Sequence, residues 1–92
     1  MIVRILGEGQ LAVDDSIATE LNELDAKLEA AVNADDEAAL RPVLTALLAR
    51  IRALGTPVPP DTLEPSDVIL PYADASLADV RALLSDEGLI PG

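Results

Sequence analysis

The sequence predicts an α+β domain from three features of its pattern. Two short runs rich in β-branched residues open the chain, a third such run lies near residue 68, and three segments have the apolar spacing of amphipathic helices. We therefore expect a small antiparallel-type sheet with about three helices packed mainly on one face. The 92 residues match the length of one domain, so residues 1–92 are expected to fold as a single unit.

The opening segment, MIVRILGEGQLAV, has the pattern of a β-hairpin with a three-residue turn. Such a loop usually needs a left-handed residue before the second strand, so Gly9 is expected to have a positive φ angle. Strand alternation then divides the side chains between two faces. The set expected to face the core is Val3, Ile5, Leu11 and Val13. The set expected on the opposite, partly covered face is Ile2, Arg4 and Leu6.

A first helix is expected to end near residue 32. Asp14, Asp15 and Ser16 precede it and are favourable N-cap residues. The apolar positions that recur with helical spacing are Ile17, Leu21, Leu24, Leu28 and Ala31 or Val32. The outer face is expected to be acidic, with Glu20, Glu23, Asp25 and Glu29 against the single Lys27.

A second helix is expected to begin after Asp35 or Asp36 and to end at Gly55. Its apolar positions are Leu40, Val43, Leu44, Leu47, Leu48, Ile51 and Leu54. Pro42 cannot donate a backbone hydrogen bond, so either the helix kinks there or its regular part begins with Pro42 near the first turn.

Residues 56–66, TPVPPDTLEPS, contain four of the seven prolines and are expected to form an extended connector. The run after it, Val68 to Leu70, lies between Pro65 and Pro71, and prolines are tolerated at the ends of edge strands. Because an isolated hairpin is marginal in water, we expect this run to form the third strand.

A third helix is predicted by SLADVRALLSDEG, in which Ser76 is the N-cap and Asp79 its capping-box partner. Its apolar positions are Leu77, Val80, Leu83 and Leu84, and Gly88 is expected to stop it. The closing segment LIPG is expected to dock on the sheet.

The composition argues against catalysis. The chain has no Cys and no His, which excludes thiolate nucleophiles, imidazole bases and zinc sites built from those ligands. Gly7-Glu8-Gly9 leads into a strand rather than a helix, so it is expected to be a turn and not a phosphate-binding loop. The aspartate pairs at 14–15 and 35–36 stand where helices begin and are expected to act as caps. We therefore predict a non-enzymatic protein with no catalytic residue, cofactor or metal.

The charge indicates the class of partner. Seventeen acidic and six basic residues give a formal net charge of −11, which would repel nucleic acid and anionic lipid headgroups. A protein with a basic patch is the expected partner, and the candidate partner-binding residues are Glu20, Glu23 and Glu29. The competing interpretation is that the charge only keeps a small aliphatic protein soluble. The chain shows neither a signal peptide nor a membrane-spanning run, so a cytoplasmic location is expected.

Three segments, MIVRILGEGQ, PSDVILP and SLADVRALLSDEGLIPG, resemble the PspA-associated protein family, PspAA. The resemblance implies a non-enzymatic accessory of the phage-shock, or membrane-stress, response that binds PspA, a coiled-coil protein that coats the cytoplasmic membrane. Contact with the membrane would then be indirect, through PspA at its inner face. Pro42 departs from the uninterrupted second helix expected of the family. The alternative function is a small acidic antitoxin-like inhibitor of a basic protein, and self-association is left open.

Overall fold

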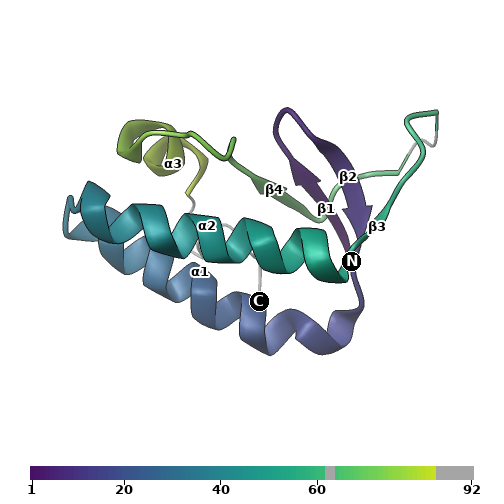
Figure 1. Cartoon of the computed structure of the whole chain (residues 1–92), viewed down its shortest axis with the longest axis horizontal. Coiled ribbons are helices and arrows are strands. Elements are labelled where there is room, and N and C mark those ends of the chain that lie inside the picture. Colours follow the sequence, from purple (N-terminus) through teal and green to yellow (C-terminus); the bar gives the residue numbers. More distant parts are fainter. Residues whose placement is uncertain (62–63, 85–92) are drawn as a thin grey trace.

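The computed structural model describes residues 1–61 and 64–84. Its elements in chain order are β1 (Ile2–Ile5), β2 (Gly9–Ala12), the 3₁₀ turn η1 (Asp15–Ile17), α1 (Ala18–Asn33), α2 (Glu37–Leu54), β3 (Thr56–Pro57), β4 (Val68–Leu70) and α3 (Leu77–Leu83). In Figure 1, α1 and α2 lie side by side below the strands, and the β1–β2 hairpin projects away from them. The predicted α+β class is confirmed.

The sheet has four strands in the order β3-β2-β1-β4. β1 pairs with β2 in antiparallel fashion, and with β4 in parallel fashion, with Val3 opposite Val68. The predicted third strand therefore joins the sheet at its edge, next to β1. The sheet is mixed rather than antiparallel throughout, because two helices and the connector bring the chain back in the direction of β1.

β3 is a strand that the proline-rich composition did not reveal. Thr56 lies opposite Ala12 and Pro57 opposite Leu11, in antiparallel pairing with β2. Directly after the strand, the N–H of Val58 donates a 3.0 Å hydrogen bond to the carbonyl of Gln10. Pro57 is tolerated here because the strand lies at the sheet edge. The first residues of the expected connector thus belong to the sheet.

The hydrophobic core is built from aliphatic side chains and lies between the sheet and the helices. The side chains that are at most 1% exposed are Val3, Ile5, Leu21, Leu28, Leu40, Leu44, Leu47, Leu48, Ile51, Leu70 and Val80. Val68 and Val13 are also buried, and Leu11 packs half-buried against this cluster. The helical and strand periodicities therefore predicted the core correctly at these positions.

The turn between α1 and α2 is built from two aspartates. Asp35 has a positive φ of 55°, and its N–H donates to the carbonyl of Val32 at 3.0 Å, which closes the end of α1. Asp36 is the N-cap of α2, and its side chain accepts a hydrogen bond from the N–H of Ala39 at 3.1 Å. α2 then runs through Pro42 instead of beginning there, with the exposed proline in the second helical turn.

α3 begins as predicted and ends earlier. Ser76 and Asp79 form a capping box, with hydrogen bonds in both directions between side chain and backbone. The helix already ends at Leu83, because Leu84 has an extended backbone with ψ 137°. Gly88, the expected helix stop, and the segment LIPG lie outside the described residues.

Both glycines of the hairpin turn have left-handed backbone conformations. The φ angle is 84° at Gly7 and 101° at Gly9, which confirms the prediction for Gly9. A β-carbon on Gly7 would also lie 2.8 Å from the ring of Tyr72, whereas one on Gly9 would meet no atom within 4 Å. Gly7 is therefore restricted by packing as well as by backbone conformation.

The hairpin turn gives a paired prediction. Gly9→Val is expected to cost about 1 kcal/mol or more of the unfolding free energy through backbone strain alone. Gly7→Ala carries similar strain and must in addition displace Tyr72, the only aromatic residue of the chain. Near-ultraviolet circular dichroism should therefore change in the Gly7 variant and stay unchanged in the Gly9 variant. Identical spectra for both variants would contradict the Tyr72 contact.

A second prediction concerns the buried side of α2. Truncating Leu47 or Ile51 to Ala is expected to cost roughly 2 to 5 kcal/mol, because each leaves a cavity in a domain with little stability to spare. Thr45→Ala, on the exposed side of the same helix, should change the unfolding free energy by less than about 0.5 kcal/mol. Urea denaturation measures all three. A wild-type midpoint for Leu47→Ala would show that this side does not carry the core.

Candidate functional site

The three acidic residues predicted to bind a partner do not form one patch. Glu20 and Glu29 are nine residues apart, about two and a half helical turns, so they project from opposite flanks of α1. Both are half-buried, and of the three only Glu23 is exposed. The structure therefore brings Glu20 and Glu23 near one another and separates Glu29 from them.

Glu20 is already paired within the chain. Its Oε2 accepts a hydrogen bond from Nη2 of Arg50 at 2.9 Å, and its Oε1 lies 2.9 Å from Nε of the same guanidinium. This bidentate ion pair connects α1 to the C-terminal part of α2. Sequence reasoning assigned Arg50 no specific partner, because the two residues lie 30 positions apart.

Asp25 does not lie on the outer acidic face, contrary to expectation. It is 4% exposed and belongs to the buried side of α1. It comes four residues after Leu21 and three before Leu28, so helical geometry places all three on the same side. That spacing would have located Asp25 correctly if it had been applied to the charged residues as well as the apolar ones.

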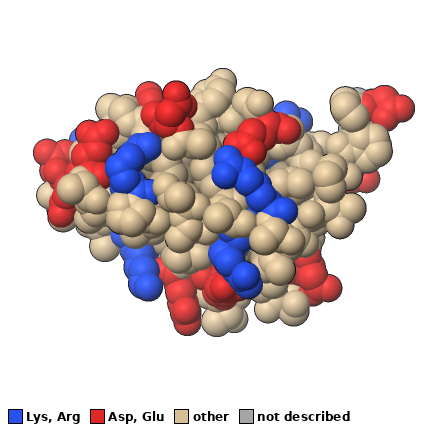
Figure 2. Space-filling model, viewed as in Figure 1, with Lys and Arg blue, Asp and Glu red and all other residues tan. Residues whose placement is uncertain are grey.

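Most of the basic residues tie separate elements together. Arg52 of α2 donates to Glu8 in the hairpin turn at 2.8 Å, and Arg81 of α3 contacts Asp35 in the α1–α2 turn at 3.1 Å. The Nη1 of Arg41 donates to the carbonyl of Ala73 at 3.2 Å. Figure 2 shows the result on the face where α2 lies in front, with blue and red side chains next to one another.

Arg4 differs from these arginines. It is exposed, and within residues 1–61 and 64–84 its side chain takes part in no ion pair or hydrogen bond that fixes it. In the sheet it stands opposite Gln10 on β2 and Ile69 on β4. It therefore projects from the middle of the face that the helices leave open.

We call this open side the outer sheet face. It consists of Ile2, Arg4, Gln10, Ala12 and Ile69, with Leu6 directly after β1. Ile69 is 45% exposed, and Ile2 and Leu6 are half-buried. The predicted partly covered face around Ile2, Arg4 and Leu6 is thus confirmed.

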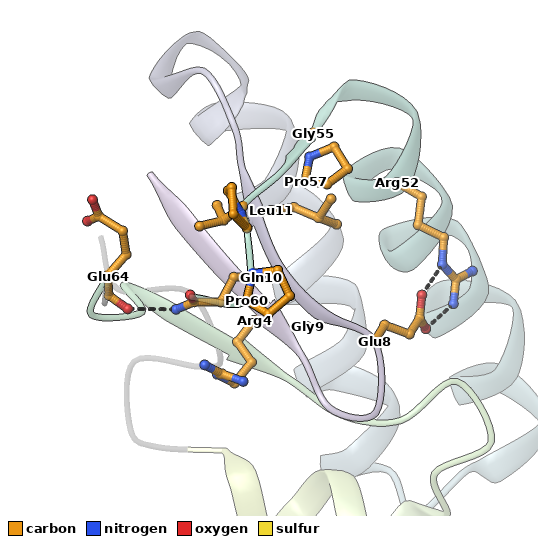
Figure 3. Close-up of a pocket in the computed structure, with 12 residues that line it drawn as sticks. Arg4, Glu8, Gly9, Gln10, Leu11, Arg52, Gly55, Pro57, Pro60 and Glu64 are labelled. Carbon is orange, nitrogen blue, oxygen red and sulfur yellow. Dashed lines mark hydrogen bonds and ion pairs between the residues drawn. The ribbon is translucent and has the colours of Figure 1, made fainter. Parts of the chain in front are cut away.

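A groove of about 670 Å³ adjoins the outer sheet face, between the hairpin and the proline-rich connector. It is lined by Arg4, Glu8, Gly9, Gln10, Leu11, Arg52, Gly55, Pro57, Val58, Pro59, Pro60 and Glu64. Gln10 holds the connector in place, because its Nε2 donates to the carbonyl of Glu64 and to Oγ of Ser66, both at 2.8 Å. In Figure 3, dashed lines join Gln10 to Glu64 and Glu8 to Arg52, and no dashed line reaches Arg4.

The groove and the outer sheet face offer a guanidinium, an amide and apolar side chains, without a nucleophile and base in contact. In the part of the chain that the structure describes, no group of three or more acidic side chains is placed to hold a metal ion. None of the described helices is long and apolar enough to cross a membrane.

Comparison with known proteins gives one match. The model of a family described as PspA-Associated protein matches residues 1–92, the whole chain. No curated protein and no solved structure matches.

The Glu8–Arg52 pair predicts a pH dependence of stability. The hydrogen bonds from Arg52 lower the pKa of Glu8 below its ordinary value of 4.5. The pair should therefore contribute fully above about pH 4.5, and its contribution should be lost as the pH falls through the folded-state pKa. Since both side chains are more than a third exposed, the contribution should be below about 1 kcal/mol.

A double-mutant cycle with Glu8→Gln and Arg52→Gln isolates this contribution from that of the other carboxylates. The coupling free energy from urea denaturation should be measurable at pH 7 and vanish at strongly acidic pH. A coupling that grows as the pH falls would contradict the assignment.

Proposed function

The chain belongs to the PspA-associated protein family, and we propose that it is a non-enzymatic accessory protein that binds PspA. The family match over residues 1–92 is the observation that carries this proposal. An exposed sheet face and an open groove, with no assembled set of catalytic groups among residues 1–61 and 64–84, support a role in binding over a role in catalysis.

The location follows from the proposed partner. PspA coats the cytoplasmic membrane according to the resemblance described above, so the protein would act in the cytoplasm and reach the membrane through PspA. The net charge of −11 supports indirect contact, because anionic headgroups repel such a surface.

Docking through the carboxylates of α1 stays a prediction. The partner would present a basic stretch to Glu23, with Glu20 and Glu29 on the two flanks of the helix. Of these, Glu23 is the most available, because it is exposed and its neighbour Glu20 is bonded to Arg50. Attraction between such exposed charges would be screened by salt and would act mostly on the association rate.

The experiment is a titration of the protein with purified PspA at two salt concentrations. Saturable binding is expected, and absence of binding by the wild type would overturn the proposed function. A pull-down from lysate adds the partner's identity: recovery of a nuclease or another basic enzyme in place of PspA would favour the antitoxin-like alternative.

The role of the acidic residues is tested in the same titration. If α1 docks electrostatically, the double variant Glu23→Lys with Glu29→Lys should bind PspA more weakly at low salt. Its unfolding free energy should change by less than about 1 kcal/mol, since neither substitution removes the Glu20–Arg50 pair. The control carries the same charge change elsewhere, at the exposed residues Glu37 and Asp74. Equal affinities for both double variants would show that only net charge matters.

A further inference from the structure

Arg4 differs from most basic residues of this chain in its contacts. Arg50, Arg52 and Arg81 form ion pairs, and Arg41 donates to a backbone carbonyl. Within the described residues, only Arg4 and Lys27 among the six basic side chains have neither kind of contact. Lys27 projects from the exposed side of α1, whereas Arg4 stands among apolar side chains on a sheet.

The carboxylates around Arg4 are engaged elsewhere. Asp67, which precedes β4, accepts the backbone N–H of Ile2 at 2.7 Å, and Glu8 is bonded to Arg52. In Figure 3 the carboxylate of Glu64 points away from Arg4, and no dashed line joins the two. The guanidinium therefore offers its forked set of donors outward, in the geometry that binds a carboxylate with two parallel hydrogen bonds.

The neighbours of Arg4 define what a bound segment must carry. Ile69 lies beside it on the next strand, at the usual strand separation of about 4.8 Å, and Leu6 lies two residues further along the chain. Side chains one turn apart on a helix are separated by about 5 to 6 Å, which is close to the Arg4–Ile69 spacing. A helix that carries an acidic residue one turn from an apolar residue can thus place one on Arg4 and the other on Ile69.

The edges of the sheet are less suited to pairing with a partner strand than the open face is to binding a helix. The two edge strands are three and two residues long, and Pro71 follows the first while Pro57 ends the second. Such short edges with prolines offer few free backbone groups to an added strand. The open face is therefore the better docking surface.

We propose that the outer sheet face binds a helix of PspA that presents an Asp or Glu carboxylate to Arg4 and apolar side chains to Ile69 and Leu6. This inference rests on the proposed function, and it specifies the surface and the chemistry of the contact. Arginine is among the residues that most often dominate binding energy at protein interfaces, especially when apolar contacts around it exclude water.

The test compares two charge reversals, Arg4→Glu and Lys27→Glu, in titrations with purified PspA. Both positions are exposed and both variants change the net charge equally. Arg4→Glu is expected to weaken binding by about 30-fold or more, as for a dominant interface residue. Lys27→Glu is expected to stay within about threefold of the wild type. Equal affinities of the two variants, with wild-type binding intact, would overturn this inference and leave the proposed function standing.

A second measurement leaves Arg4 unchanged, in case its reversal disturbs the sheet. The chain has no cysteine, so a single introduced cysteine can carry a photoreactive group. The test variant is Ile69→Cys, and the control is Ala46→Cys on the exposed side of α2. Cross-links to PspA are expected from position 69 alone, at a helical segment with acidic and apolar residues. Cross-links from position 46 alone, or to a basic segment, would overturn the proposal.

Discussion

The central strand β1 is restrained on both edges and on one face, and the rest of the structure depends on that restraint. It pairs with β2 on one side and β4 on the other, and Val3 and Ile5 are fully buried under the helices. Because side chains alternate along a strand, a slip of one residue would turn Arg4 into the aliphatic core. Burial of an unpaired guanidinium costs so much free energy that a shifted register of β1 would be far less stable. The same alternation that packs the core therefore exposes Arg4 on the outer sheet face.

Ion pairs at the surface orient the elements around this sheet and contribute little stability themselves. Arg50 connects α2 to α1, and Arg52 connects the end of α2 to the hairpin turn. Exposed pairs of this kind are usually worth about 0 to 1 kcal/mol. In a chain with a net charge of −11, each arginine also reduces repulsion among carboxylates that the fold brings close. The arginines are thus largely used for internal contacts, and Arg4 is the exception among the arginines when contacts within residues 1–61 and 64–84 are considered.

The sequence predicted those features that depend on local rules. The hairpin turn follows from Gly7 and Gly9, and the start of α3 follows from the capping box of Ser76 and Asp79. The sequence did not predict non-local features of the fold. The pairing of Pro57 with Leu11 and the parallel direction of β4 depend on how a long connection folds back, which no local pattern encodes.

The candidate site was predicted less well than the fold, for two physical reasons. Helical phase separates Glu20 from Glu29 and buries Asp25, and this could have been deduced from spacing alone. The engagement of Glu20 by Arg50 could not, because it depends on how α1 packs against α2. Arg4 was correctly expected on the open face. Its difference from the other arginines depends on their ion pairs and hydrogen bonds, which form between residues far apart in the sequence.

An open sheet face must satisfy two conditions, and its residues show how both are met. In the free protein it must remain soluble, which Arg4 and the fixed amide of Gln10 promote beside the exposed Ile69. In a complex, the apolar contacts around Arg4 would remove water from its charge, and a partner without a carboxylate at that point would leave the charge buried and unpaired. The cost of that mismatch discriminates against apolar surfaces of similar shape. Under the proposed docking, one arginine within an apolar face would therefore supply solubility in the free state and selectivity in the bound state.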